Sequence, residues 1–65
     1  MEFKYNEKEW VIGARTENFI VFCSRRKITS VLNNNILNLC EELLSYGFIP
    51  DFSLLANNNE IFFRK

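Results

Sequence analysis

Histidine is absent from this chain, and cysteine, glycine and proline are rare. Without histidine, a serine or cysteine nucleophile lacks its usual general base, and the acidic residues show no paired spacing for acid–base catalysis. The two cysteines, Cys23 and Cys40, lie far apart and do not have the CxxC spacing of a zinc site. The sequence therefore predicts a protein that is not an enzyme and that binds neither a metal nor a cofactor.

An excess of charge of one sign is also missing, because eight acidic residues balance eight basic ones. This balance argues against a general electrostatic attraction to nucleic acid or to an anionic membrane. No apolar run approaches the roughly 20 residues that cross a bilayer, and no signal-peptide pattern opens the chain. We therefore expect a cytoplasmic protein with two buried free thiols and no membrane partner. The abundance of Asn, Ile and Phe is typical of a low-GC genome, such as that of a phage or another mobile element.

Hydrophobic residues, in contrast, make up 48% of the 65 residues. A single domain of this size buries only about 60% of the surface that its unfolded chain exposes. Its core rarely supplies more than about 3–5 kcal/mol of stability. Since neither a disulfide nor a metal is expected, association with another protein chain is the remaining source of stabilisation.

The N-terminal half predicts a three-stranded antiparallel meander, formed by residues 2–5, 9–15 and 19–23. Tight turns between these segments pair Trp10 with Cys23 and Ile12 with Val21, so that Trp10 and Ile12 share one face. The dense run of aromatic and β-branched residues in the third strand favours the same arrangement.

Residues 28–46 follow the period of an amphipathic helix, with Gly47 at the position of a left-handed C′ residue. The weak point is the run Asn33–Asn35, because asparagine is a mediocre helix former. The alternative is a helix that begins at Asn34 or Asn35, preceded by an extra strand over Ile28–Leu32.

Residues 52–56 and 60–64 flank three asparagines, which tolerate the conformations of tight turns. This pattern predicts a C-terminal hairpin with Leu54 opposite Ile61 and Phe52 opposite Phe63. The predicted fold is therefore a single α+β domain over residues 1–65, with an antiparallel sheet and the element order βββαββ.

These pairings leave the sheet apolar on both faces, although one helix is available to cover it. The face opposite Trp10 would contain Val11, Ile20, Phe22, Leu55 and Phe62. An exposed apolar patch of this kind usually marks a binding site. We therefore predict a protein interface at these residues, covered by a second copy in a homodimer or by a larger partner that the protein regulates or inhibits. The alternatives are a sheet that curls strongly and a segment at Met1 that folds over the patch.

Arg25, Arg26 and Lys27 form the only cluster of like charges, at the expected strand-to-helix turn. Backbone N–H groups at a helix N-terminus favour anions, and basic side chains add to this attraction. An alternative function is therefore a small nucleic-acid-binding regulator that uses these three residues.

Overall fold

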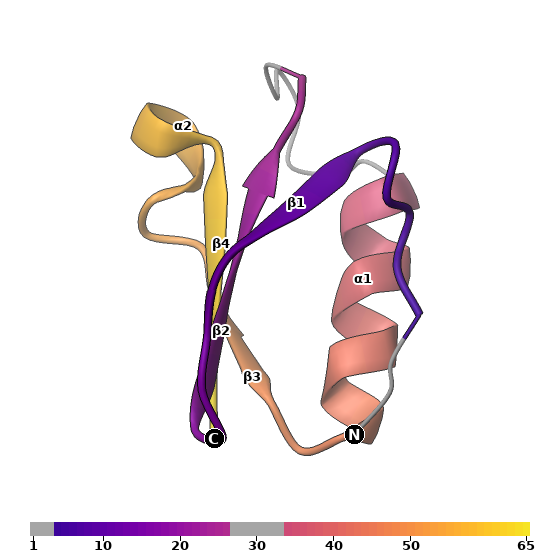
Figure 1. Ribbon diagram of the computed structural model, residues 1–65, viewed down its shortest axis with the longest axis vertical. Helices are drawn as coiled ribbons and strands as arrows, with labels where there is room; N and C mark the ends of the chain where they lie inside the picture. The colour runs from indigo at the N-terminus through magenta and orange to yellow at the C-terminus, as the bar shows by residue number, and fades with distance from the viewer. Residues whose placement is uncertain (1–3, 27–33) are drawn as a thin grey trace.

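The computed structural model describes residues 4–26 and 34–65. Its elements are β1 (Trp10–Arg15), β2 (Phe19–Ser24), α1 (Asn34–Ser45), β3 (Ile49–Asp51), α2 (Leu55–Asn58) and β4 (Glu60–Arg64). The strands form one four-stranded antiparallel sheet in the order β1-β2-β4-β3. Helix α1 packs over one face of this sheet (Figure 1). The structure thus combines helices with an antiparallel sheet, as expected, but its element order differs from the predicted one.

The turn between β1 and β2 determines which side chains enter the core. The Thr16 Oγ1 accepts hydrogen bonds from the backbone N–H groups of Asn18 and Phe19, each at 3.1 Å. The Thr16 N–H donates to the Phe19 carbonyl at 2.8 Å. These bonds place the turn at Glu17–Asn18, one residue later than the sequence pattern predicts, since threonine side chains stabilise such turns locally.

A β-bulge at Gly13 then changes the register of β1 against β2. Ile12 pairs with Phe22 and not, as expected, with Val21. Because side chains alternate along a strand, a slip of one residue turns the whole strand over. Trp10 stays on the core side of β1, as predicted, but the side chains of β2 that enter the core are Ile20 and Phe22. The predicted face of β2 is therefore wrong.

Gly13 leaves room at the bulge for the side chain of Cys23 on the neighbouring strand. A Cβ atom at this position would lie 2.9 Å from the Cys23 Sγ, which is closer than real Cβ atoms come to other atoms. A residue without a side chain relieves this crowding.

Helix α1 ends in a Schellman motif, as the sequence predicts. The Phe48 N–H donates to the Leu43 carbonyl at 3.1 Å and the Gly47 N–H donates to the Leu44 carbonyl at 3.0 Å. Gly47 has a φ of 89°, which a residue with a Cβ adopts only with strain. The expected start of the helix and the alternative strand at 28–32 lie outside the described residues.

The C-terminal segment differs most from the prediction. Residues 52–56 do not form a strand; the partner of β4 is β3, which pairs Pro50 with Phe63. Leu55 begins the short helix α2 and is buried in the core. Asn59, in the left-handed conformation with a φ of 56°, ends α2 and leads the chain into β4. The asparagines therefore end a helix and do not form a hairpin turn.

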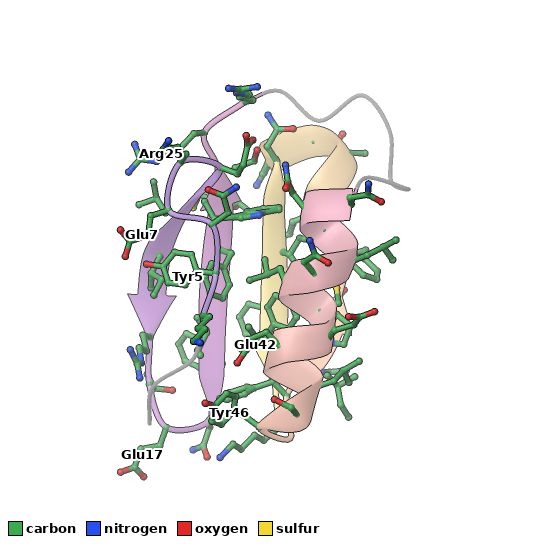
Figure 2. The ribbon with its side chains drawn as sticks, turned by 90° about the vertical axis from the view of Figure 1, so that its right-hand side faces the viewer. Tyr5, Glu7, Glu17, Arg25, Glu42 and Tyr46 are labelled. Atoms are coloured by element: carbon green, nitrogen blue, oxygen red, sulfur yellow. The ribbon has the colours of Figure 1, made fainter. Side chains whose placement is uncertain are left out.

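The predicted first strand, residues 2–5, is only partly described. Lys4–Asn6 adopts no strand, and the Asn6 carbonyl accepts hydrogen bonds from the N–H groups of Glu9 and Trp10, each at 3.0 Å. The remaining residues of that strand lie outside the described part. Tyr5 packs against the core beside α1 (Figure 2).

The core lies between α1 and the inner face of the sheet, and Phe22 is at its centre. Its ring meets those of Tyr5, Trp10 and Phe63 edge to face, with centroid distances of 5.1, 6.4 and 5.7 Å. Helix α1 contributes the buried side chains Ile36, Leu39, Cys40 and Leu43. Within the described residues, no helix is long and apolar enough to cross a membrane.

Candidate protein interface

The face of the sheet opposite α1, which we call the outer face, gathers apolar side chains from three strands. Phe62 lies between the fully buried Ile61 and Phe63, so strand alternation directs it away from α1. Val21 pairs with Phe62 across β2 and β4, and the Phe19 ring stacks on Phe62 with centroids 5.3 Å apart. The apolar centre of the outer face consists of Val11, Phe19, Val21 and Phe62.

This apolar centre remains partly open to solvent. Val11 is 39% exposed, and Phe19, Val21 and Phe62 are half-buried. Figure 1 shows α1 on the opposite side of the sheet, while α2 lies beside the start of β4, on the side away from α1 and at one end of the outer face. An antiparallel sheet normally presents polar residues on a solvated face. Apolar side chains in this position are typical of an interaction surface.

The outer face contains part of the predicted interface. Val11 and Phe62 lie on it, as expected. Ile20, Phe22 and Leu55 are buried in the core and therefore cannot line an exposed surface. The one-residue slip of β2 turns Ile20 and Phe22 toward the core and their neighbours toward the outer face. The helical turn of α2 directs Leu55 into the core.

Phe19 and Val21 are the residues of the apolar centre that sequence analysis missed. Two signals for them exist in the sequence: Thr16, which favours a turn at the next two residues, and Gly13, which permits a bulge.

Two opposite charges flank the apolar centre along β4. Glu60 and Arg64 lie on the same side of the strand as Phe62, two residues before and two residues after it. One Glu60 oxygen accepts a hydrogen bond from the Cys23 thiol at 3.5 Å, and the other accepts one from the Asn58 Nδ2 at 3.3 Å. Among the described residues, neither Glu60 nor Arg64 forms a salt bridge.

Cys23, on the outer face, and Cys40, in the core, are free thiols. Burial raises the pKa of Cys23, and the Glu60 carboxylate that accepts its S–H raises this pKa further. Burial in the core raises the pKa of Cys40. Both environments favour the protonated thiol, which is the unreactive form.

Asp51 lies at the edge of the outer face, where it pairs with Phe62. The backbone N–H of Ser53 donates to its carboxylate at 2.9 Å and lowers its pKa. The positive charge of Arg64 lowers this pKa further. Arg64 is therefore close enough to Asp51 to lower its pKa, although the guanidinium of Arg64 forms no salt bridge within residues 4–26 and 34–65.

Two of the three residues of the predicted anion site, Arg25 and Arg26, are described, and the site as a whole stays a prediction. The Arg25 Nε donates to the Glu7 carbonyl at 2.9 Å, and the Arg26 Nε lies 3.8 Å from a Glu9 carboxylate oxygen. Both arginines thus attach the end of β2 to the turn before β1 (Figure 2), and neither belongs to the first described turn of α1. Lys27 lies outside the described residues. No observation favours nucleic acid as the ligand of this cluster.

A shallow hollow of about 280 Å³ lies between the N-terminal segment and α1. It is lined by Lys4, Tyr5, Asn6, Asn35, Asn38, Leu39 and Glu42; Figure 2 shows Tyr5 and Glu42 on its two sides. Its lining mixes polar and apolar side chains, and among the described residues no buried charged or polar side chain fixes the position of a ligand.

No protein-family model, curated protein or solved structure matches this chain. The outer face is the feature from which a function is inferred.

Proposed function

We propose that this protein is a small, non-catalytic protein-interaction module whose outer face binds another protein surface. The observation that supports this function is the partial exposure of the apolar centre formed by Val11, Phe19, Val21 and Phe62 in the described part of the chain. Burying such side chains against a partner stabilises the complex by about 25 cal/mol for each Å² removed from water. A domain with a small core gains a large fraction of its total stability in this way.

A module of this kind acts by occupying a surface. It regulates or inhibits a larger protein when that protein needs the occupied surface for its own activity. The protonated thiols of Cys23 and Cys40 agree with a role in binding and not in chemistry.

Phe62→Glu tests this function, because it places a charge at the middle of the apolar centre. Phe62 is half-buried, so a glutamate there reaches water in the monomer but is desolvated in a complex. The control is Leu44→Glu, which also replaces an apolar side chain with glutamate, at a position of α1 that is 52% exposed and lies on the other side of the sheet (Figure 1).

Two readouts apply to the wild type and both variants: the mass in solution by light scattering, and the host proteins retained by the immobilised chain. We expect Phe62→Glu to abolish the association that the wild type and Leu44→Glu show. Far-UV circular dichroism checks that each variant is folded. Identical masses and identical retained proteins for all three chains would refute the proposed function.

A further inference from the structure

We infer that the surface covering the outer face is that of a second copy of this chain, related by a two-fold axis that runs across the strands between the two sheets, level with Phe62. This inference rests on the proposed function, because it names the partner of the same face. A two-fold dimer uses the same patch on both copies, so the patch must be complementary to itself. The charges along β4 satisfy this condition.

The outward side chains of β4 follow the order acid, aromatic, base: Glu60, Phe62 and Arg64. A two-fold axis across the strands reverses β4 in the second copy. Phe62 then lies opposite the partner subunit's Phe62, and Glu60 lies opposite the partner subunit's Arg64. The same contact forms a second time with the roles exchanged. An axis along the strands would instead place like charges opposite each other, which disfavours that arrangement.

The spacing between packed sheets suits these contacts. Two sheets pack face to face about 10 Å apart, with their strands within about 30° of each other. The aromatic rings of Phe19 and Phe62 fill this layer from each side. The long side chains of Glu60 and Arg64 reach toward each other from the two ends of β4.

Neither charge has to give up a strong interaction to form the contact. Glu60 accepts hydrogen bonds only from a thiol at 3.5 Å and from an amide at 3.3 Å among the described residues. Arg64 is exposed and has no salt bridge there. The axis also brings Asp51 to the level of the partner subunit's Asp51. Asp51 lies on the edge strand β3, at the border of the interface, where water and salt screen this like-charge contact.

The size of the face sets the expected affinity. Four strands about 4.8 Å apart, with a rise of about 3.3 Å for each of about five residues, give a footprint of roughly 300 Å². A standard interface buries about 800 Å² on each partner. The footprint is less than half of this area, so we expect a weak, reversible dimer with a dissociation constant in the high micromolar range. Exposed ion pairs add at most about 1 kcal/mol each, so the charges select the orientation more than they strengthen the dimer.

Charge reversal tests this arrangement in two single variants, Glu60→Arg and Arg64→Glu. Each variant by itself replaces both attractive contacts with repulsive ones, and we expect its dissociation constant to rise at least about tenfold. In an equal mixture, one copy offers two arginines and the other two glutamates, so both contacts become attractive again. The mixture should regain the wild-type dissociation constant within about threefold. The control is Glu41→Arg, which makes the same change of charge on the exposed side of α1.

The assay is sedimentation equilibrium over a concentration series up to about 1 mM, which covers micromolar dissociation constants. The inference is overturned if the wild type is monomeric throughout, if the single variants associate as well as the wild type, or if their mixture does not recover. If the wild type is monomeric but binds a host protein that Phe62→Glu does not bind, the dimer is refuted and the proposed function is supported. If Phe62→Glu changes neither self-association nor the binding of host proteins, both proposals are refuted.

Discussion

Replacing Phe22 with alanine tests whether β2 presents Ile20 and Phe22 to the core. Phe22 is fully buried and its ring meets three other aromatic rings at centroid distances of 5.1, 6.4 and 5.7 Å. A buried Phe→Ala change costs about 3–5 kcal/mol. The core of a domain of this size supplies about the same amount in total. We therefore expect Phe22→Ala to be largely unfolded in water.

The matched control is Phe19→Ala, the same change three residues earlier on the same strand. Phe19 is half-buried and stacks on a single ring, that of Phe62. Removing a side chain that is already partly in water should cost about 1–2 kcal/mol. A third variant, Phe22→Leu, keeps most of the buried volume and should leave a folded state that can be measured.

Urea unfolding followed by far-UV circular dichroism measures the free energies of unfolding. Fluorescence of Trp10, the only tryptophan and 2% exposed, serves as a second probe. All chains are compared at one protein concentration, because self-association adds to the apparent stability. If Phe19→Ala destabilises the protein as much as Phe22→Ala does, β2 faces the other way, and the observed turn and bulge are refuted.

Three further predictions concern the glycines and the thiols. Gly13→Ala should lower the free energy of unfolding by about 1–3 kcal/mol, because its Cβ would lie 2.9 Å from the Cys23 Sγ. Adding Cys23→Ala to this variant should recover more than half of that loss. If the effects of the two substitutions on urea unfolding simply add, the crowding is contradicted. Gly47→Ala should cost about 1 kcal/mol in thermal unfolding, because φ is 89° there and the surrounding space is open; an unchanged melting temperature would argue against the left-handed C′ residue. Because burial and Glu60 raise the pKa of Cys23, its alkylation at mildly alkaline pH should be slower than that of a free thiol and faster in Glu60→Gln. Alkylation of Cys23 as fast as in the denatured chain would contradict the raised pKa. The raised pKa also makes the free energy of unfolding depend on pH. This free energy is unchanged below the ordinary thiol pKa and falls as the pH rises above it, because the unfolded chain loses the thiol proton first.

The parts of the fold that sequence analysis predicted correctly are set by local interactions. The strands around Trp10–Arg15 and Phe19–Ser24 follow from β-branched and aromatic side chains. The end of α1 follows from one residue, Gly47, that reaches a positive φ without strain. The alternation of Ile61 and Phe63 with Phe62 follows from strand geometry, and both faces of β4 were therefore predicted correctly.

The C-terminal segment shows where local preference is insufficient. Residues 52–56 have the composition of a strand, yet the chain pairs β4 with the shorter Ile49–Asp51. Leu55 is buried because it lies in α2. The stabilisation from this burial comes from tertiary packing, which helix and strand propensities do not describe.

The candidate interface depends both on the sequence composition and on the tertiary structure. By itself, the sequence determined that this chain has more apolar strand residues than one helix covers, because that surplus is a matter of composition and period. Only the tertiary structure decided which of them remain outside. A turn capped by Thr16 and a bulge at Gly13 shift β2 by one residue, and a one-residue shift exchanges its two faces. Phe22 thereby became the centre of the core, while Phe19 and Val21 joined Phe62 on the outer face.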